Sequence, residues 1–200
     1  MRLIFYILIL LSVLLPQDQM FVGTRPLGMG GAFIAVADDG NTITWNPAGL
    51  PRLRRKEFTS SYADLYAMNI THSYAGVVWP FGDRIAIGFD WSNIGFDDQE
   101  LNYSENKLNF SLGYQPIKML SIGGTFKYLS RDMGLDGTSY GKTSGIGYDI
   151  GLLFSPFKKL RFGMGVYDLG GTDVTYKQNK VDETILGQAF KLGIAYFPVD

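Results

Sequence analysis

Large apolar residues alternate with small or polar ones through most of the chain from about residue 56 onward. A period of two along the sequence is the pattern of a β-strand whose two sides meet different surroundings. The sequence therefore predicts an all-β fold of about eight strands, which cover residues 56–65, 71–80, 84–94, 107–115, 119–129, 143–154, 160–168 and 188–197.

The two sides of these predicted strands differ strongly in side-chain size. One parity is large and apolar, as in Phe89 and Trp91 of one run and Tyr148 and Ile150 of another, whereas the opposite parity carries mainly Gly, Ser and Asn with scattered charges. A soluble sandwich would present many Lys, Glu and Thr to water on its polar side. A small-residue side instead suits the interior of a membrane barrel whose apolar residues face lipid. The pattern favours an antiparallel transmembrane β-barrel, with a soluble exported β-sandwich that binds a partner or a saccharide as the alternative.

The connections between the predicted strands alternate in length. Short proline-containing turns lie at 80–83, 115–118 and 155–159, and longer polar connections lie at 95–106, 130–142 and 169–187. Transmembrane barrels have short periplasmic turns at one rim, longer extracellular loops at the other, and aromatic girdles at both. The expected girdle residues are Trp79, Phe81, Tyr114, Phe154, Phe157 and Tyr196 near the short turns, and Tyr62, Tyr66, Trp91, Phe96, Tyr103 and Tyr128 near the long connections.

The first residues have the pattern of an export signal. Met1 and Arg2 precede an apolar run of 13 residues, Leu3 to Leu15. Such a run is too short for a hydrocarbon core of about 30 Å, which requires about 20 apolar residues in a helix. Residues 1–17 are therefore predicted to be a signal peptide, which indicates an exported protein.

Residues 24–53 do not alternate, and residues 18–54 are predicted to form a compact hatch, or plug, of turns and short helices, followed by barrel strands over residues 55–200. Asn46 and Pro47 have the chemistry of a helix start, an Asn cap followed by proline at the first helical position. Gly28, Gly30 and Gly31 would permit tight backbone geometry or close packing against a barrel wall. Asp38 and Asp39 lack the spaced ligands of a calcium loop, so they are expected to lie in a turn.

The string from Leu27 to Leu50, LGMGGAFIAVADDGNTITWNPAGL, resembles the N-terminal signature of the FadL-like outer-membrane barrels, and especially of their PorV/PorQ branch. Three later stretches of sequence, KYL (127–129), YDIGLL (148–153) and DLGG (168–171), resemble strand sequences of the same branch. The resemblance implies a barrel of about 14 strands with the N-terminal segment inside as a hatch. Because the sequence predicts only about eight strands, we expect it to cover an incomplete barrel.

The same resemblance implies a location in the outer membrane of a Gram-negative-type bacterium, with membrane lipid as a partner. PorV is a type IX secretion component, whereas FadL passes long-chain fatty acids. We therefore expect a secretion-associated protein that contacts secretion-system components. The alternative is a channel for long-chain fatty acids or other hydrophobic small molecules.

Five ionisable residues lie on the small-residue parity of the predicted strands: Asp90, Lys127, Asp149, Arg161 and Lys191. A charge in a confined interior is costly unless it is paired or hydrated. We expect these side chains to pair with one another or to contact the hatch, with ligand recognition as the alternative.

Other chemistry has little support in the sequence. His72 is the single histidine, and a lipase-like site would need it together with Ser73 or Ser111, although no spacing singles out a partner. The chain has no cysteine and a formal net charge of −1. We therefore expect no enzyme, no cofactor or metal site, and no binding to nucleic acid.

Overall fold

A computed structural model describes residues 22–198 except 66, 98–100, 136–137 and 177–181. The predicted signal peptide therefore lies outside the described residues. The hatch contains α2 (Thr24–Gly28), α3 (Thr42–Trp45) and the 3-10 helix η1 (Pro47–Arg52). The strands that follow are β1 (Glu57–Leu65), β2 (Ile70–Phe81), β3 (Ile85–Asp97), β4 (Leu101–Ile117), β5 (Leu120–Leu135), β6 (Thr138–Phe157), β7 (Leu160–Tyr167), β8 (Thr172–Tyr176), β9 (Asp182–Leu186) and β10 (Ala189–Tyr196).

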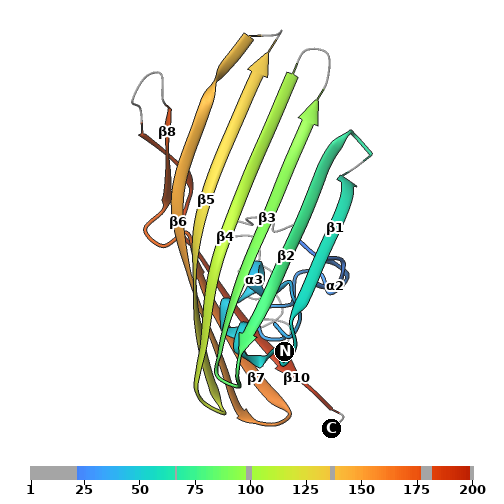
Figure 1. The fold of residues 1–200 in the computed structure, drawn as a ribbon, viewed down its shortest axis with the longest axis vertical. Coiled ribbons are helices and arrows are strands. Elements are labelled where there is room, and N and C mark those ends of the chain that lie inside the picture. Colours follow the sequence, from blue (N-terminus) through green and yellow to red (C-terminus); the bar gives the residue numbers. More distant parts are fainter. Residues whose placement is uncertain (1–21, 66, 98–100, 136–137, 177–181, 199–200) are drawn as a thin grey trace, which may run out of the picture.

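The strands form one curved antiparallel sheet in the order β1-β2-β3-β4-β5-β6-β7-β10 (Figure 1). This confirms the predicted all-β fold, because each of the eight predicted runs corresponds to one strand of this path. In the described residues the sheet is open, with β1 and β10 at its edges. The tight turns lie at the bottom of Figure 1 and the long hairpins extend to the top, while the hatch packs beside the lower half of the sheet.

The long connections contain more strand than the sequence predicted. The predicted loop 95–106 is mostly the upper ends of β3 and β4, and the predicted loop 130–142 is mostly those of β5 and β6. A third, 169–187, contains the β8–β9 hairpin, whose first strand pairs with β6. These ends were missed because their outward-facing positions are polar or glycine, so the run of large apolar residues on that parity stops. The apolar residues that remain, such as Phe96 and Tyr103, lie on the opposite parity. Cross-strand contacts hold them instead, such as the Arg131–Glu105 ion pair at 2.6 Å.

The outer face of the sheet is apolar and fully open to its surroundings. Phe89, Phe110 and Tyr148 are exposed over 47%, 50% and 51% of their surface, and Phe89, Phe110, Phe126 and Tyr148 stand side by side on four neighbouring strands. No second sheet covers this face in the part of the chain that is described. The sandwich alternative is therefore wrong, because it requires these side chains to be buried between two layers. An apolar face of this extent suits hydrocarbon rather than water.

The apolar band of the outer face has a sharp upper border. Its last row crosses four strands through Trp91, Leu108, Tyr128 and Ile146. The next outward-facing row is entirely polar and consists of Asn93, Asn106, Ser130 and Ser144. A tilted strand needs about 9–11 residues to cross a membrane. Since β4 has 17 residues and β6 has 20, their upper ends extend beyond the apolar band.

The predicted lower girdle agrees with the structure, because its six aromatic residues are all exposed beside the tight turns. In the upper girdle, Tyr62, Trp91 and Tyr128 are also exposed, and Trp91 and Tyr128 lie on the border row. Phe96 and Tyr103 are half-buried and belong to the polar hairpin above that border. Tyr66 lies outside the described residues.

The hydrophobic core lies between the hatch and the inner face of the sheet. One cluster centres on Phe33 and Trp45 and includes Leu153 from β6. A second brings Ile43 and Leu50 of the hatch against Val78 and Ala86 of the wall. The described helices are all too short, or not apolar enough, to cross a membrane.

Candidate functional site

A row of glycines crosses the inner face of the sheet directly below the hatch. Gly113, Gly123, Gly151 and Gly165 are cross-strand neighbours on β4, β5, β6 and β7. Neighbouring positions on one face of a sheet stand side by side, so the row forms a strip of bare backbone. The strip allows another segment of backbone to approach the wall closely.

Helix η1 lies against this strip. A Cβ placed on Gly113 would lie 2.5 Å from Pro51 Cδ, and one on Gly123 would lie 2.5 Å from the Ala48 nitrogen. A Cβ on Gly151 would overlap the Asn46 side chain. These positions accept no side chain. In this strip, the small residues predicted on the inner parity therefore form a closely packed contact surface for the hatch.

Asn46 joins the hatch to the wall. Its side-chain oxygen accepts a hydrogen bond from the Ala48 N–H at 3.1 Å, and Pro47 follows as the first residue of η1. This confirms the predicted cap. The amide nitrogen donates to the carbonyl of Ile34 at 2.8 Å and to that of Leu152 on β6 at 3.3 Å. One buried side chain thus closes η1, fixes the preceding loop and contacts the sheet.

Asn46→Asp is expected to lower the free energy of unfolding by about 1–3 kcal/mol or more. The carboxylate keeps the cap acceptor but sets an oxygen against two carbonyl oxygens, where the amide had donated. The urea midpoint of the folded, heat-modifiable form in detergent measures the loss. Asn102→Asp, at an exposed position of β4, is the matched control and should move that midpoint by less than about 0.5 kcal/mol equivalent. Equal shifts for the two variants would contradict the role assigned to Asn46.

Two of the predicted glycines allow the backbone of the hatch itself to turn. Gly30 and Gly31 have φ values of +63° and +80°, which a residue with a Cβ rarely adopts. The alternative prediction, close packing against the barrel wall, is wrong for all three. A Cβ on Gly28 or Gly30 would meet nothing within 4 Å, and one on Gly31 would only approach Trp45 of the hatch itself. The close packing instead uses glycines of the wall, where η1 approaches them.

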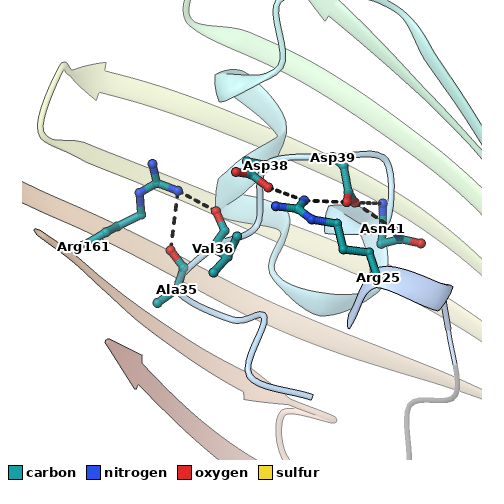
Figure 2. Close-up of polar contacts among 7 residues, drawn as sticks. All are labelled: Arg25, Ala35, Val36, Asp38, Asp39, Asn41 and Arg161. Atoms are coloured by element: carbon teal, nitrogen blue, oxygen red, sulfur yellow. Dashed lines mark hydrogen bonds and ion pairs between the residues drawn. The ribbon is translucent and has the colours of Figure 1, made fainter. Parts of the chain in front are cut away.

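Asp38 and Asp39 close the outer part of the hatch through Arg25. The Arg25 guanidinium lies 2.6 Å from Asp38 and 2.7 Å from Asp39, as Figure 2 shows. Hydrogen bonds to Asp38 and then Asp39 raise the pKa of Arg25 above its ordinary value. Asp39 also accepts hydrogen bonds from the backbone and side chain of Asn41, both at 2.8 Å. Asp39 begins the predicted turn, since its carbonyl accepts from the Thr42 N–H at 3.0 Å, and Asp38 lies just before that turn.

Arg161 and Lys191 of the wall contact the hatch. The Arg161 guanidinium donates to the carbonyls of Ala35 and Val36 (Figure 2). The Lys191 ammonium lies 5.6 Å from the Trp45 ring and 5.0 Å from the Tyr167 ring, within reach of cation–π attraction. The Tyr167 hydroxyl donates to the Trp45 carbonyl. Arg161 and Tyr167, both on β7, thus satisfy hatch carbonyls that no helix pairs, whereas Lys191 of β10 contacts aromatic rings.

Asp90 is buried on β3 and receives hydrogen bonds from several elements. Thr44 of the hatch donates to it at 2.9 Å and Asn109 of β4 at 2.8 Å, while the Tyr74 hydroxyl of β2 lies at 3.5 Å. This carboxylate therefore connects α3 to three strands of the wall.

Lys127, Asp149 and Asp168 form the most buried cluster of ion pairs in the described residues. The Lys127 ammonium lies 2.8 Å from Asp149 and 2.6 Å from Asp168. The Asp168 carboxylate also accepts a hydrogen bond from Thr172 at 2.6 Å, and its backbone N–H donates to Asp149 at 2.9 Å. This cluster connects β5, β6 and the chain just after β7.

Sequence reasoning missed Asp168 because the strand period ends there. Tyr167 already points inward, so alternation would turn Asp168 outward. Its φ of +50° breaks the alternation and brings the carboxylate back to Lys127. Thr44, Tyr74 and Tyr167 were also missed, since an isolated hydroxyl gives no sequence signal of its partner.

The structure does not assemble the serine and histidine of a lipase site. His72 is buried on the inner face, whereas Ser73, the next residue of β2, faces the other side. Ser111 is hydrogen-bonded to Thr125 at 2.7 Å. Across the sheet, His72 is aligned with Ile94 of β3 and with Glu105 of β4. Ser111 lies six residues further along β4, so about 20 Å separates it from the row of His72.

A curved antiparallel sheet with an apolar outer face, and with an inner face filled by an N-terminal hatch, defines the class of plugged transmembrane β-barrels. A scan of protein-family models and a search of curated proteins each found no match.

Among solved structures, the chain is similar to one described as the CymD monoaromatic hydrocarbon channel. The similarity has a TM-score of 0.60 at 17% sequence identity, and it covers 88% of this chain. The chain spans 61% of the length of that channel. The likeness confirms the predicted FadL-like barrel fold, whereas the assignment to the PorV/PorQ branch stays a prediction.

Proposed function

We propose that this protein is an outer-membrane channel for hydrophobic small molecules. The observation that carries the proposal is a hatch sealed onto the inner wall of a lipid-facing sheet, within a fold shared with a hydrocarbon channel. A barrel that passed only hydrophilic solutes would benefit from an open, wet lumen. A tightly seated plug blocks that route, so solutes of low polarity must pass around the hatch or move it.

The outer membrane, reached through the signal peptide, is the proposed location, and membrane lipid is the proposed partner. The band of exposed aromatic and aliphatic side chains on the outer face supports this. We also propose that the protein is not an enzyme, which is in keeping with the separation of His72 from Ser73 and Ser111.

Uptake by a strain that lacks the protein tests the channel. We expect slower uptake of a radiolabelled monoaromatic hydrocarbon or a long-chain fatty acid, restored by the full-length gene, with unchanged uptake of a small sugar as the control. The sugar is hydrophilic and enters by other pores. Unchanged uptake of both apolar compounds would overturn the proposal, and the preferred compound would identify the substrate class.

A role in type IX secretion is the second candidate, and the Leu27–Leu50 string carries it. The structure gives a packing reason for the most specific part of this string, Asn46–Leu50: all five residues are buried against the wall or the hatch. Any plugged barrel needs that packing, whatever it transports, so the channel is preferred. Accumulation of secreted cargo in the periplasm of the deletion strain, with normal uptake of apolar compounds, would favour secretion instead.

A further inference from the structure

Seven cations surround the end of the sheet that carries the tight turns. We call them the basic collar, and all of them are exposed: Arg54, Arg55, Lys56, Arg84, Lys118, Lys158 and Lys159. In the same stretches, 53–56, 82–84, 117–119 and 157–159, the single carboxylate is Asp83, which pairs with Arg54 at 2.9 Å. This rim is therefore strongly positive, in a chain whose formal net charge is −1.

The other end of the sheet carries no excess of cations in the part of the chain that is described. Arg131 lies 2.6 Å from Glu105, and Lys142 lies 3.1 Å from Asp132. The excess of cations therefore belongs to the tight-turn rim and is not spread over both ends of the described strands.

Each tight turn combines a cation with an exposed apolar side chain. Phe81 precedes Arg84 in the first turn, and Ile117 precedes Lys118 in the second, both apolar groups being 54% exposed. In the third turn, Phe157, which is 71% exposed, precedes Lys158 and Lys159. An apolar group at the acyl boundary with a cation just beyond it places positive charge at the depth of the lipid phosphates.

The turns are held in place by hydrogen bonds between neighbouring hairpins. The Gln115 N–H donates to the Arg84 carbonyl at 2.8 Å, and the Ser155 N–H donates to the Met119 carbonyl at 2.7 Å. The Phe197 N–H donates in the same way to the Lys159 carbonyl at 2.8 Å. The cations are thus carried at regular positions along the rim by an ordered backbone.

Lys56 shows the same combination before β1. Its ammonium lies 3.4 Å from the centroid of the Trp79 ring, which faces outward at the lower girdle. Tryptophan rings favour the headgroup level of a membrane. A lysine held on such a ring is therefore placed at the surface of the bilayer.

We propose that the basic collar binds the phosphate groups of anionic phospholipids, of which phosphatidylglycerol is the simplest, in the leaflet nearest the tight turns. This rests on the proposed function, because it requires the sheet to span a membrane. The collar follows the tight-turn rim of the sheet, and the cations of the three turns, like Lys56, border exposed apolar side chains of the lipid-facing side. Many identical phosphates in a bilayer match that arrangement better than an acidic protein, which would have to reach these groups from the membrane side.

Electron paramagnetic resonance of spin-labelled lipids tests the proposal. The full-length protein is inserted into phosphatidylcholine bilayers, and the association of spin-labelled phosphatidylglycerol is compared with that of spin-labelled phosphatidylcholine. We expect a preference for phosphatidylglycerol that weakens as salt is added, since exposed charges are screened over about 10 Å at 0.1 M ionic strength. The triple variant Arg84→Gln, Lys118→Gln and Lys158→Gln should lose most of that preference.

The matched control is Arg131→Gln with Lys142→Gln at the other end of the sheet, and it should keep the preference. Heat-modifiable migration of each variant in phosphatidylcholine shows that it has folded. Three results would each contradict lipid binding by the basic collar and leave the channel proposal intact. They are equal association of the two lipids, a preference that does not change with salt, and a triple variant that behaves as wild type. Failure of the wild-type chain to insert into any bilayer would overturn both.

Discussion

Gly123→Val is expected to displace the hatch from the barrel wall or to prevent folding altogether. The new side chain would overlap the Pro47 carbonyl group and lie against the Ala48 nitrogen, and both are backbone atoms that no rotamer change can move. Overpacking a well-packed core costs about 1–3 kcal/mol and sometimes more, and a clash with backbone belongs at the upper end of that range. The yield of heat-modifiable, protease-resistant protein measures the effect.

Gly124→Val is the matched control, one residue further along the same strand. Its side chain would point to the outer face, where a Cβ would approach only the Asp149 carbonyl oxygen, at an ordinary 3.7 Å. Valine also suits a strand that faces lipid. We expect this variant to fold as well as wild type. Equal loss in the two variants would show that Gly123 is needed for strand conformation and not for seating the hatch.

Lys127→Met is expected to lower the free energy of unfolding by about 3–5 kcal/mol, because it leaves two buried carboxylates facing each other without their cation. The urea midpoint of the folded form, at constant lipid or detergent, measures the loss. The double variant Lys127→Met with Asp168→Asn should recover part of it, since one of the unpaired charges is then removed.

Lys142→Met is the matched control for this cluster. It removes a lysine from a pair of similar geometry, 3.1 Å from Asp132, but the two side chains are 71% and 44% exposed. An ion pair in water contributes about 0–1 kcal/mol. A midpoint shift as small for Lys127→Met as for Lys142→Met would mean that water reaches the buried cluster and that it does not hold β5, β6 and the end of β7 together.

The sequence by itself determined the sheet and its two faces. Alternation of Ile85, Phe89 and Trp91 with small residues is a local property of the strand, so it can be counted before the fold is known. The same holds for the approximate positions of the tight turns, although Pro80, Pro116 and Pro156 lie in the strand ends just before them and not in the turns as predicted. It also holds for the cap at Asn46 and Pro47, which involves residues close together in the chain. The exposed apolar band follows directly from that parity.

Only the tertiary structure decided what the inner face holds. The glycines at 113, 123 and 151 belong to three different strands. Only the cross-strand register aligns them under η1, where together they make room for the hatch. Asp168 reaches Lys127 through a left-handed turn that reverses its parity. The upper strand ends lose the large apolar residues of the outward parity, so their pairing depends on partners across the sheet. Alternation along a strand indicates which medium each side chain faces. Contacts between distant segments depend on register and loop closure, and the sequence of a single strand contains no pattern that predicts these.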